Sequence, residues 1–343
     1  MTHPPPLSRD RLMQLIHRMK SSRVVVVGDI MIDRYLFGDT ERLSPEAPVP
    51  VVTVRDRQAK LGGAANVAAN VASMGATCLL VGTVGDDGDG AAIRQELVVA
   101  RLDGRFVVTV AGRPTTSKTR IIARSQQIVR IDDEVDALLE GPNLARLVKA
   151  AQDALADADA LLLEDYNKGA LAPGLIAPVM EVARRRGIPV VVDPKYHQFF
   201  EYAGATVFKP NRRELESALG AAVDLQDRNA LPEVLTRLKA DNLLVTLGAE
   251  GMLLVTKDGS SLRIPSIARK VYDVSGAGDT VTAWLGTALA AGASLAEAAQ
   301  LANYAAGVEV GKPGVATVTP EEVLAVHEER FDQIGRLRRG GAI

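Results

Sequence analysis

Residues 24–33 read V-V-V-V-G-D-I-M-I-D, and this stretch decides the fold. Short apolar runs like V-V-V-V-G recur at 78–85, 160–165, 189–193 and 242–248. Helical patterns lie between most of them, at 142–156, 174–186 and 227–240, and Ala-rich helices are expected at 63–75, 277–291 and 294–310. Such alternation predicts an α/β fold with a doubly wound, mostly parallel sheet that helices flank on both faces.

Two segments break this alternation. Residues 34–56 and 105–132 are rich in β-branched residues and lack a helical period. We expect them to form a small β-sheet lid over the crevice at the carboxyl ends of the main strands. The prediction is a single domain over 1–343, with a peripheral N-terminal helix within 1–20 and a loose peripheral tail at 331–343.

Composition excludes several classes of protein. The 343 residues are 47% apolar and 24% charged, with a net charge of −2, so no overall attraction to nucleic acid or an anionic membrane is expected. A single cysteine, Cys78, excludes an internal disulfide framework and suits a reducing cytoplasm. The sequence shows neither a long membrane-spanning run nor the apolar core of a signal peptide, so we expect a cytoplasmic protein.

Familiar nucleotide-binding and metal signatures are missing. There is no G-x-x-x-x-G-K-[ST] loop, no H-R-D or D-F-G motif, and no G-x-G-x-x-G, because Val281 stands where the third glycine would be. Four histidines and one cysteine argue against a zinc site.

The stretch G-A-G-D at 276–279 precedes an apolar helical run. Backbone N–H groups of Gly276, Ala277 and Gly278 at a helix start form an anion-binding nest, and Asp279 is placed to accept a proton from an attacking hydroxyl. The alternative is a Gly-rich turn in which Asp279 caps the helix.

Three further motifs carry polar groups. In K-P-N-R-R-E at 209–214, Asn211 and Glu214 share a helix face and suit the water shell of Mg²⁺, unless they form a capping box. T-L-G-A-E-G at 246–251 permits close approach of a ligand or makes a hairpin turn. G-D-I-M-I-D at 28–33 and L-G-G-A-A-N at 61–66 offer carboxylates and amides for sugar hydroxyls, or are loop acids and helix-start glycines.

In this order the motifs resemble the ribokinase, or PfkB-type, family of carbohydrate kinases, from about Val24 to Thr319. R-L-S-P-E-A-P-V-P-V-V at 42–52, K-T-R-I-I-A-R-S-Q-Q-I-V-R-I-D at 118–132, D-Y-N-K-G-A-L at 165–171 and D-P-K at 193–195 are similar to the bacterial D-glycero-D-manno-heptose-7-phosphate kinases. Two departures are Val274 in D-V-S-G-A-G-D, where threonine is commoner, and Glu164 in E-D-Y-N-K-G, where serine is commoner. No H-x-G-H motif follows, so the resemblance is to the stand-alone kinase.

The resemblance implies an enzyme that uses ATP and Mg²⁺ to phosphorylate O1 of heptose 7-phosphate, for the ADP-heptose of the lipopolysaccharide core. It implies that Asp279 is the base and that Gly276, Ala277 and Gly278 stabilise the transferred phosphoryl group. It assigns the nucleotide to Asn211, Thr246, Gly248, Gly251 and Asn303, and the metal, through water, to Glu214 and Asn211. It assigns the sugar phosphate to Asp33, Gly62, Gly63, Asn66, Arg120, Arg124, Arg130, Asp165, Lys168 and Lys195.

The resemblance also implies a monovalent cation such as K⁺ and a homodimer formed through the lid. Another sugar kinase of the same family is the nearest alternative. A non-catalytic sugar sensor has no need of the base Asp279, and a dinucleotide oxidoreductase would need the missing third glycine.

Overall fold

The computed structural model describes residues 4–124, 126–225, 230–268 and 270–339. Within these ranges the main sheet has nine strands in the order β13-β12-β11-β10-β9-β8-β1-β4-β5. These strands are β1 (Arg23–Gly28), β4 (Thr77–Gly85), β5 (Val107–Val110), β8 (Ala160–Glu164), β9 (Val190–Asp193), β10 (Val207–Phe208), β11 (Leu243–Thr246), β12 (Met252–Val255) and β13 (Ser261–Ile264). The strands from β5 to β11 pair in parallel, whereas β12 and β13 add an antiparallel edge.

The valines of β1 explain why the sheet is covered on both faces. Val24 and Val26 belong to one hydrophobic core, and Val25 and Val27 belong to the other. Alternate side chains of a strand point to opposite faces, so a continuous valine run needs helices on both sides.

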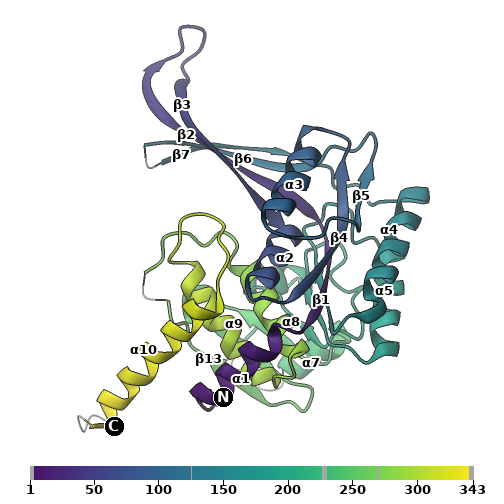
Figure 1. The fold of residues 1–343 in the computed structure, drawn as a ribbon, viewed down its shortest axis with the longest axis vertical. Helices are drawn as coiled ribbons and strands as arrows, with labels where there is room; N and C mark the ends of the chain where they lie inside the picture. Colours follow the sequence, from purple (N-terminus) through teal and green to yellow (C-terminus); the bar gives the residue numbers. More distant parts are fainter. Residues whose placement is uncertain (1–3, 125, 226–229, 269, 340–343) are drawn as a thin grey trace.

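One face is covered by α1 (Arg9–Met19), α2 (Ala64–Ser73), α3 (Gly88–Val99), α8 (Ala277–Ala290), α9 (Leu295–Glu309) and α10 (Pro320–Arg339). The other face is covered by α4 (Gly141–Ala154), α5 (Pro173–Arg186), α6 (Arg212–Leu219) and α7 (Ala230–Leu238). Figure 1 shows α4 and α5 on the opposite side of the sheet from α2 and α8. The predicted doubly wound α/β fold is therefore confirmed.

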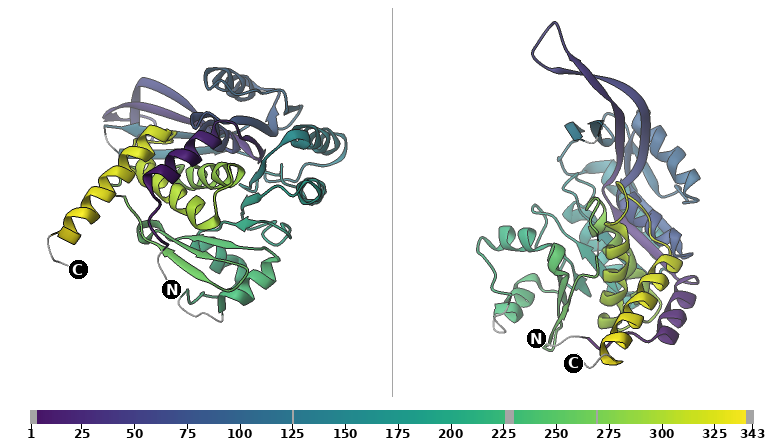
Figure 2. Two further views of the ribbon diagram at one scale, coloured as in Figure 1. Left: turned by 60° about the horizontal axis from the view of Figure 1, so that its bottom comes forward. Right: turned by 90° about the vertical axis from the view of Figure 1, so that its left-hand side faces the viewer.

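A second sheet of four strands, in the order β3-β2-β6-β7, rises from the body of the molecule (Figures 1 and 2). Its strands are β2 (Ile30–Leu43), β3 (Pro50–Gly63), β6 (Thr116–Ala123) and β7 (Gln126–Asp133). We call these four strands the lid sheet. Only Asp29 separates the end of β1 from the start of β2, and β3 leads directly into α2.

Three details differ from the sequence prediction. Residues 107–110, expected in the lid, form β5 and pair in parallel with β4 at the edge of the main sheet. The lid strands instead extend to Ile30 and Gly63, beyond the predicted 34–56. The tail R-L-R-R-G-G-A-I at 336–343, expected to be loose, is helical as far as Arg339, where α10 ends, and its last four residues lie outside the described residues. The first residues of the helix expected at 227–240 lie outside the described residues, and the described part of this helix is Ala230–Leu238.

Among the described helices, none combines the length and apolar character needed to cross a bilayer.

Candidate active site

Polar side chains gather where β1, β8, β9 and β10 end. Asp29 follows β1, Glu164 ends β8, Asp193 ends β9, and Lys209 follows β10. These strands are parallel neighbours, so their carboxyl ends meet at one edge of the sheet. The chain leaves β1 toward β4 on one side and returns to β8 on the other, and such a reversal is where open α/β sheets bind ligands.

The G-A-G-D stretch begins α8 at this edge. Gly276 is the N-cap with φ 90°, and no side chain caps the helix. The positive φ favours glycine, and a Cβ on Gly276 would in addition crowd Asn66 Nδ2 at 3.2 Å and Glu309 Oε1 at 3.3 Å. The alternative that Asp279 caps the helix is wrong, because Asp279 is the third residue of α8.

Asp279 is buried, and both of its carboxylate oxygens accept hydrogen bonds. Asn66 Nδ2 donates to Oδ2 at 2.7 Å, and the Tyr166 hydroxyl donates to Oδ1 at 2.7 Å. Burial raises the pKa of Asp279 to about 6, while these two hydrogen bonds act in the opposite direction. A carboxylate with this pKa is ionised at neutral pH and is still basic enough to take a proton.

Two lysines and further acids surround Asp279. Glu164, Asp193 and Asp279 each offer a carboxylate oxygen, and these oxygens lie within 4.8 Å of one another, close enough to share a metal ion. Lys209 Nζ lies 2.7 Å from Asp193 Oδ2, and Lys195 Nζ contacts Glu214 Oε1. We call these four acids and two lysines the acidic cluster.

Asn211 and Glu214 form a complete capping box at the start of α6. Asn211 Oδ1 accepts from the Glu214 backbone N–H at 2.8 Å, and Glu214 Oε2 accepts from the Asn211 backbone N–H at 2.9 Å. With Lys195 on its other oxygen, Glu214 has partners on both oxygens. The capping alternative is therefore observed, and any contact of these residues with a metal through water remains a proposal.

A cavity of about 370 Å³ lies beside the start of α8. All five residues predicted for the nucleotide line it, together with Ala277 and Gly278: Asn211, Thr246, Gly248, Gly251 and Asn303. Gly248 and Gly251 also form the hairpin loop between β11 and β12, so both interpretations of T-L-G-A-E-G hold together. Asn303 is buried and donates to the Pro265 carbonyl at 3.0 Å.

Four of the predicted sugar residues, Asp33, Gly62, Gly63 and Asn66, lie at the base of the lid sheet. Asp33 on β2 is buried and contacts Arg120 of β6. A Cβ on Gly62 would lie 2.4 Å from Asp33 Oδ2, so glycine lets this carboxylate pack against β3. Gly63 is the N-cap of α2, whose first turn carries Asn66 to Asp279.

The predicted phosphate-binding arginines fall into two environments. Arg120 and Arg130 face each other in register across β6 and β7, and Arg130 is exposed and bound to Asp132 at 2.8 Å. A strand over 119–124 would place Arg120 and Arg124 on one face, but β6 ends at Ala123 and Arg124 lies in the turn with φ 58°. The alternation of side chains ends where the strand ends.

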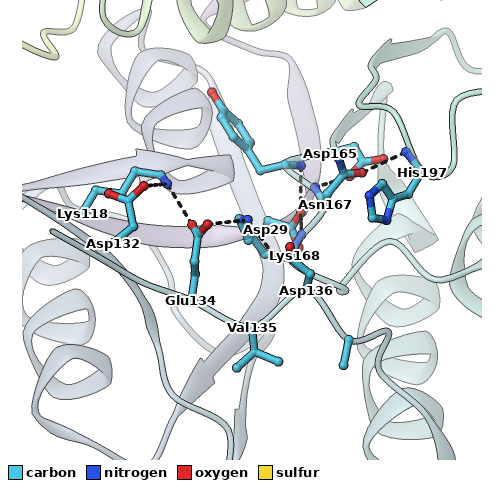
Figure 3. Close-up of polar contacts among 12 residues, drawn as sticks. Asp29, Lys118, Asp132, Glu134, Val135, Asp136, Asp165, Asn167, Lys168 and His197 are labelled. Carbon is cyan, nitrogen blue, oxygen red and sulfur yellow. Dashed lines mark hydrogen bonds and ion pairs between the residues drawn. The ribbon is translucent and has the colours of Figure 1, made fainter. Parts of the chain in front are cut away.

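Lys168 belongs to a chain of ion pairs at the root of the lid sheet, shown in Figure 3. Its Nζ lies 2.9 Å from Glu134 and 2.7 Å from Asp136, and Glu134 also contacts Lys118 at 2.8 Å. Lys168 is therefore paired with two carboxylates, and a phosphate would have to share it.

Asp165 and Asp29 shape the loop at 165–170. Asp165 is buried, accepts from the Asn167 N–H at 2.7 Å and from the Tyr202 hydroxyl at 2.8 Å, and burial raises its pKa to about 6. Asp29 accepts three backbone N–H groups of the loop, from Tyr166, Lys168 and Ala170, at 2.8–3.0 Å. Asp165 thus serves the loop rather than presenting a free carboxylate, and Asp29 fixes the residue that binds Asp279.

Sequence reasoning did not assign roles to Tyr166, Glu164, Asp193 or Lys209, although all of them lie against Asp279 or its neighbours. The motifs D-Y-N-K-G, D-P-K and K-P-N contain three of them. The signal available was position, because each of these residues ends or follows a buried strand of one parallel sheet.

Comparisons with known proteins identify a family and relatives of this chain. The family model described as pfkB family carbohydrate kinase matches residues 21–322. The chain is 44% identical over 321 residues to the Bifunctional protein HldE of Rhodospirillum rubrum, and the match covers 93% of this chain and 65% of that protein. The chain therefore spans slightly less than two thirds of the length of this relative.

Solved structures show the same fold. Arabidopsis thaliana ribokinase complexed with ribose and ATP gives a TM-score of 0.70 at 22% identity, covering 90% of this chain and 99% of that chain. Escherichia coli phosphofructokinase-2 in complex with potassium gives a TM-score of 0.74 at 18% identity, and the match covers 90% of this chain and 98% of that chain. At these identities the likeness concerns the fold alone.

Proposed function

Because the chain belongs to the pfkB family of carbohydrate kinases, we propose that it transfers the γ-phosphoryl group of ATP to O1 of D-glycero-D-manno-heptose 7-phosphate. The family membership makes the chain a phosphotransferase that acts on a sugar. The heptose assignment rests on the motifs at 42–52, 118–132, 165–171 and 193–195 and on the relative named HldE. The product, heptose 1,7-bisphosphate, would enter ADP-heptose synthesis for lipopolysaccharide, a cytoplasmic task.

The observation that carries the proposal is the position of Asp279. It directly follows Ala277 and Gly278, which line the cavity, and it accepts a hydrogen bond from the sugar-side residue Asn66. A base between a nucleotide site and a sugar site is what phosphoryl transfer to a hydroxyl requires.

The reaction step uses this arrangement directly. Asp279 takes the proton of the O1 hydroxyl through a lone pair that Asn66 and Tyr166 leave free, since an ionised carboxylate has about four acceptor sites. O1 forms a bond to the γ-phosphorus, the bond from that phosphorus to the β–γ bridging oxygen breaks, and the electron pair leaves with ADP. The backbone N–H groups of the helix start at Gly276, Ala277 and Gly278 stabilise the charge on the transferred group.

In this proposal the nucleotide occupies the cavity lined by Asn211, Thr246, Gly248, Gly251 and Asn303. Mg²⁺ supplies shielding of the phosphate charge when bound. The oxygen donors at the start of α6 and in the acidic cluster suit this ion, and Asn211 and Glu214 would hold it through water. Phosphofructokinase-2 of the same fold was solved in complex with potassium, which supports a monovalent cation as an additional component.

The sugar phosphate lies at the base of the lid sheet in this proposal. Asp33, Gly62, Gly63 and Asn66 contact the hydroxyl groups, and Arg120 is the best placed of the predicted cations for the 7-phosphate. Arg120 is largely buried beside Asp33, so a phosphate would bind a desolvated guanidinium in its preferred planar geometry. Arg130, Lys168 and Lys195 would act through the ion pairs described above, Arg124 from the turn after β6, and Asp165 through the loop at 165–170.

A homodimer through the lid sheet completes the proposal. Ile128, Val129 and Ile131 are exposed on the edge strand β7, with 39%, 44% and 54% of their surfaces accessible. Exposed edge strands with apolar side chains pair readily with a second copy. The mass from light scattering, measured for the wild type and for Ile131→Asp, tests this: a monomeric wild type would contradict it.

The test of function is product analysis. The protein is incubated with ATP, Mg²⁺ and heptose 7-phosphate, and fragmentation mass spectrometry locates the new phosphate. We expect it on carbon 1, with Asp279→Asn slowing turnover by about 10²–10⁴-fold, as loss of a general base does. ATP affinity and the thermal unfolding midpoint of this variant should stay close to the wild type.

A panel of ribose, fructose 1-phosphate and a keto-deoxy sugar acid, followed by ADP release, separates the substrates. A faster reaction with one of these sugars would overturn the heptose assignment and leave the kinase assignment intact. Near-normal turnover by Asp279→Asn would remove Asp279 from the role of base.

A further inference from the structure

Glu309, the last residue of α9, has no role in the proposed reaction. Its side chain is fully buried, and neither carboxylate oxygen has a hydrogen-bond partner among the residues that the structure describes. A buried carboxyl group without a partner is strongly unfavourable when it is ionised and much less so when it carries a proton. Burial therefore favours the uncharged form of this group.

The carboxyl group of Glu309 lies against the start of α8. Its Oε1 is 3.3 Å from the position that a Cβ would occupy on Gly276, the N-cap of this 14-residue helix. The backbone N–H groups of residues 276–278 carry the positive end of the helix dipole. An ionised carboxylate at this place weakens the attraction of the helix start for a bound anion, whereas a protonated carboxyl group does not.

Burial and two acids keep a proton on Glu309 up to mildly alkaline pH. Burial raises the pKa of Glu309 to about 8, and the charges of Asp279, in the first turn of α8, and Asp273, in the preceding loop, add to this rise. The carboxyl group is therefore mainly uncharged at neutral pH, and the ionised form dominates only above about pH 8.

Two lysines act in the opposite direction, but both have other partners. Lys60 of β3 donates to the Val315 carbonyl at 2.6 Å, and Lys312 lies 2.6 Å from Glu322 Oε1. Their charges lower the pKa of Glu309 by less than burial and the two acids raise it. Neither lysine forms an ion pair with Glu309 that would hold it in the ionised form.

We propose that Glu309 is a positioning residue for the γ-phosphoryl group of ATP, which the backbone N–H groups of residues 276–278 bind at full strength only while Glu309 carries a proton. This inference rests on the proposed function, because that function places the γ-phosphoryl group at these N–H groups. Glu309 touches neither the nucleotide nor the sugar in this proposal, and it acts through the charge behind the anion site.

A proton and the γ-phosphoryl group must then favour each other's binding. ATP binds the protonated form more tightly, so binding raises the pKa of Glu309 and the protein takes up protons near pH 8. A charge at a partly buried helix start changes the affinity for an anion by about 3–30-fold. With a pKa of about 8, about 2–8-fold of this loss of ATP affinity falls between pH 7 and 9.

The experiment measures ATP binding by calorimetry from pH 7 to 9, with Mg²⁺ and without sugar, in two buffers of different ionisation enthalpy. We expect the wild type to lose affinity by about 2–8-fold and to take up about 0.3–0.5 proton per ATP at pH 8. In Glu309→Gln the affinity should stay constant within about 1.5-fold, and the proton uptake should disappear. The variant is decisive because burial and neighbouring acids also raise the pKa of Glu164.

Two controls accompany this measurement. Glu297→Gln changes another acid of α9 whose pKa a hydrogen bond to Arg11 lowers to about 2, so its charge is constant in this range and its pH dependence should match the wild type. ADP lacks the γ-phosphoryl group and should lose less affinity than ATP between pH 7 and 9. If Glu309→Gln does not fold, the comparison of ATP with ADP in the wild type carries the test.

A wild-type ATP affinity that is constant with pH, an unchanged pH dependence in Glu309→Gln, or an equal loss for ADP and ATP overturns the proposal. Any of these results, together with a new phosphate on carbon 1 of the sugar, rejects this inference and leaves the proposed function intact. A wild type that does not bind ATP at any pH rejects both. No sugar is present, so a wrong heptose assignment leaves the measurement unchanged.

Discussion

The hydrogen bond from Tyr166 to Asp279 gives the sharpest prediction. The hydroxyl donates to Oδ1 at 2.7 Å in a partly buried setting, and it stabilises the ionised form of the carboxylate. Replacing Tyr166 by phenylalanine removes the donor and keeps the ring, over which Lys195 Nζ lies 5.1 Å from the centroid. The pKa of Asp279, about 6, must therefore rise in Tyr166→Phe.

The magnitude follows from the strength of such a bond. A hydrogen bond to a charged group contributes about 1.5–3 kcal/mol, which corresponds to about 1–2 pKa units. The pKa of the base moves to about 7–8, so at pH 6.5 the active fraction falls by about 3–25-fold, while above pH 9 activity returns nearly to the wild-type level. Burial and the Asp279 charge raise the pKa of Tyr166 itself, so the tyrosine stays neutral in this range.

The assay is kcat/KM for the sugar from pH 5 to 9.5, with ADP measured directly after quenching. The matched control is Tyr202→Phe, since Tyr202 is a buried tyrosine that donates to Asp165 at 2.8 Å rather than to Asp279. An acid limb that stays in place in Tyr166→Phe, or that moves equally in Tyr202→Phe, refutes the role of Tyr166 in positioning and tuning Asp279.

Three further predictions concern packing, pH and substrate affinity. Gly286→Ala in α8 places a Cβ 2.0 Å from Leu162 Cδ2, so urea unfolding should show a loss of about 1–3 kcal/mol, although alanine favours helices. Burial raises the pKa of Glu309 to about 8 from its ordinary 4.5. The folded state therefore holds a proton that the unfolded state releases, and wild-type stability falls relative to Glu309→Gln by up to about 1.4 kcal/mol per pH unit between these values. Arg120→Ala should raise KM for the phosphorylated sugar at least tenfold and leave KM for ATP within twofold.

Each of these has a matched control. Gly88→Ala, where an added Cβ meets no atom within 4 Å, should be neutral or stabilising, and an equal loss there would discount the contact with Leu162. The control for Glu309→Gln is Glu297→Gln, because a hydrogen bond to Arg11 lowers the pKa of Glu297 to about 2. Above pH 5 the free energy of unfolding of this variant should differ from that of the wild type by an amount that does not depend on pH. Exposed Arg130 should tolerate alanine with less than a threefold change in KM, and equal effects of Arg120→Ala on both substrates would indicate a general structural role.

The main sheet could be predicted because the local sequence of its strands is sufficient to recognise them. V-V-V-V-G and A-L-L-L-E are too apolar for any place but a strand covered on both faces. The prediction for Val107–Val110 was wrong because the sequence V-V-T-V is equally typical of a lid strand. Its pairing with β4 depends on residues far away in the chain, and the local sequence pattern does not reveal which strand is the partner.

In the candidate site, too, local sequence motifs could be recognised, whereas residues brought together by the fold could not. Asp279 and its glycines could be proposed as a site from the sequence because four consecutive residues carry both the backbone N–H groups and the carboxylate. The acidic cluster was not, because Glu164, Asp193 and Asp279 are brought together only by the parallel register of β8 and β9 and the packing of α8. Asn211 and Glu214 show the opposite case, in which a local pattern supported two interpretations and the structure shows the capping box.

The junctions of the lid sheet bear on how the protein can move. At one root, Asp29 alone joins β1 to β2 and holds the amide of Tyr166; at the other, Gly63 joins β3 to α2, which carries Asn66. Both connections of the lid sheet to the body of the molecule therefore lie close to a donor of Asp279. We expect a displacement of the lid sheet to change the geometry of these two hydrogen bonds, and with it the pKa of Asp279, so that substrate binding under the lid sheet and proton acceptance by Asp279 would be coupled.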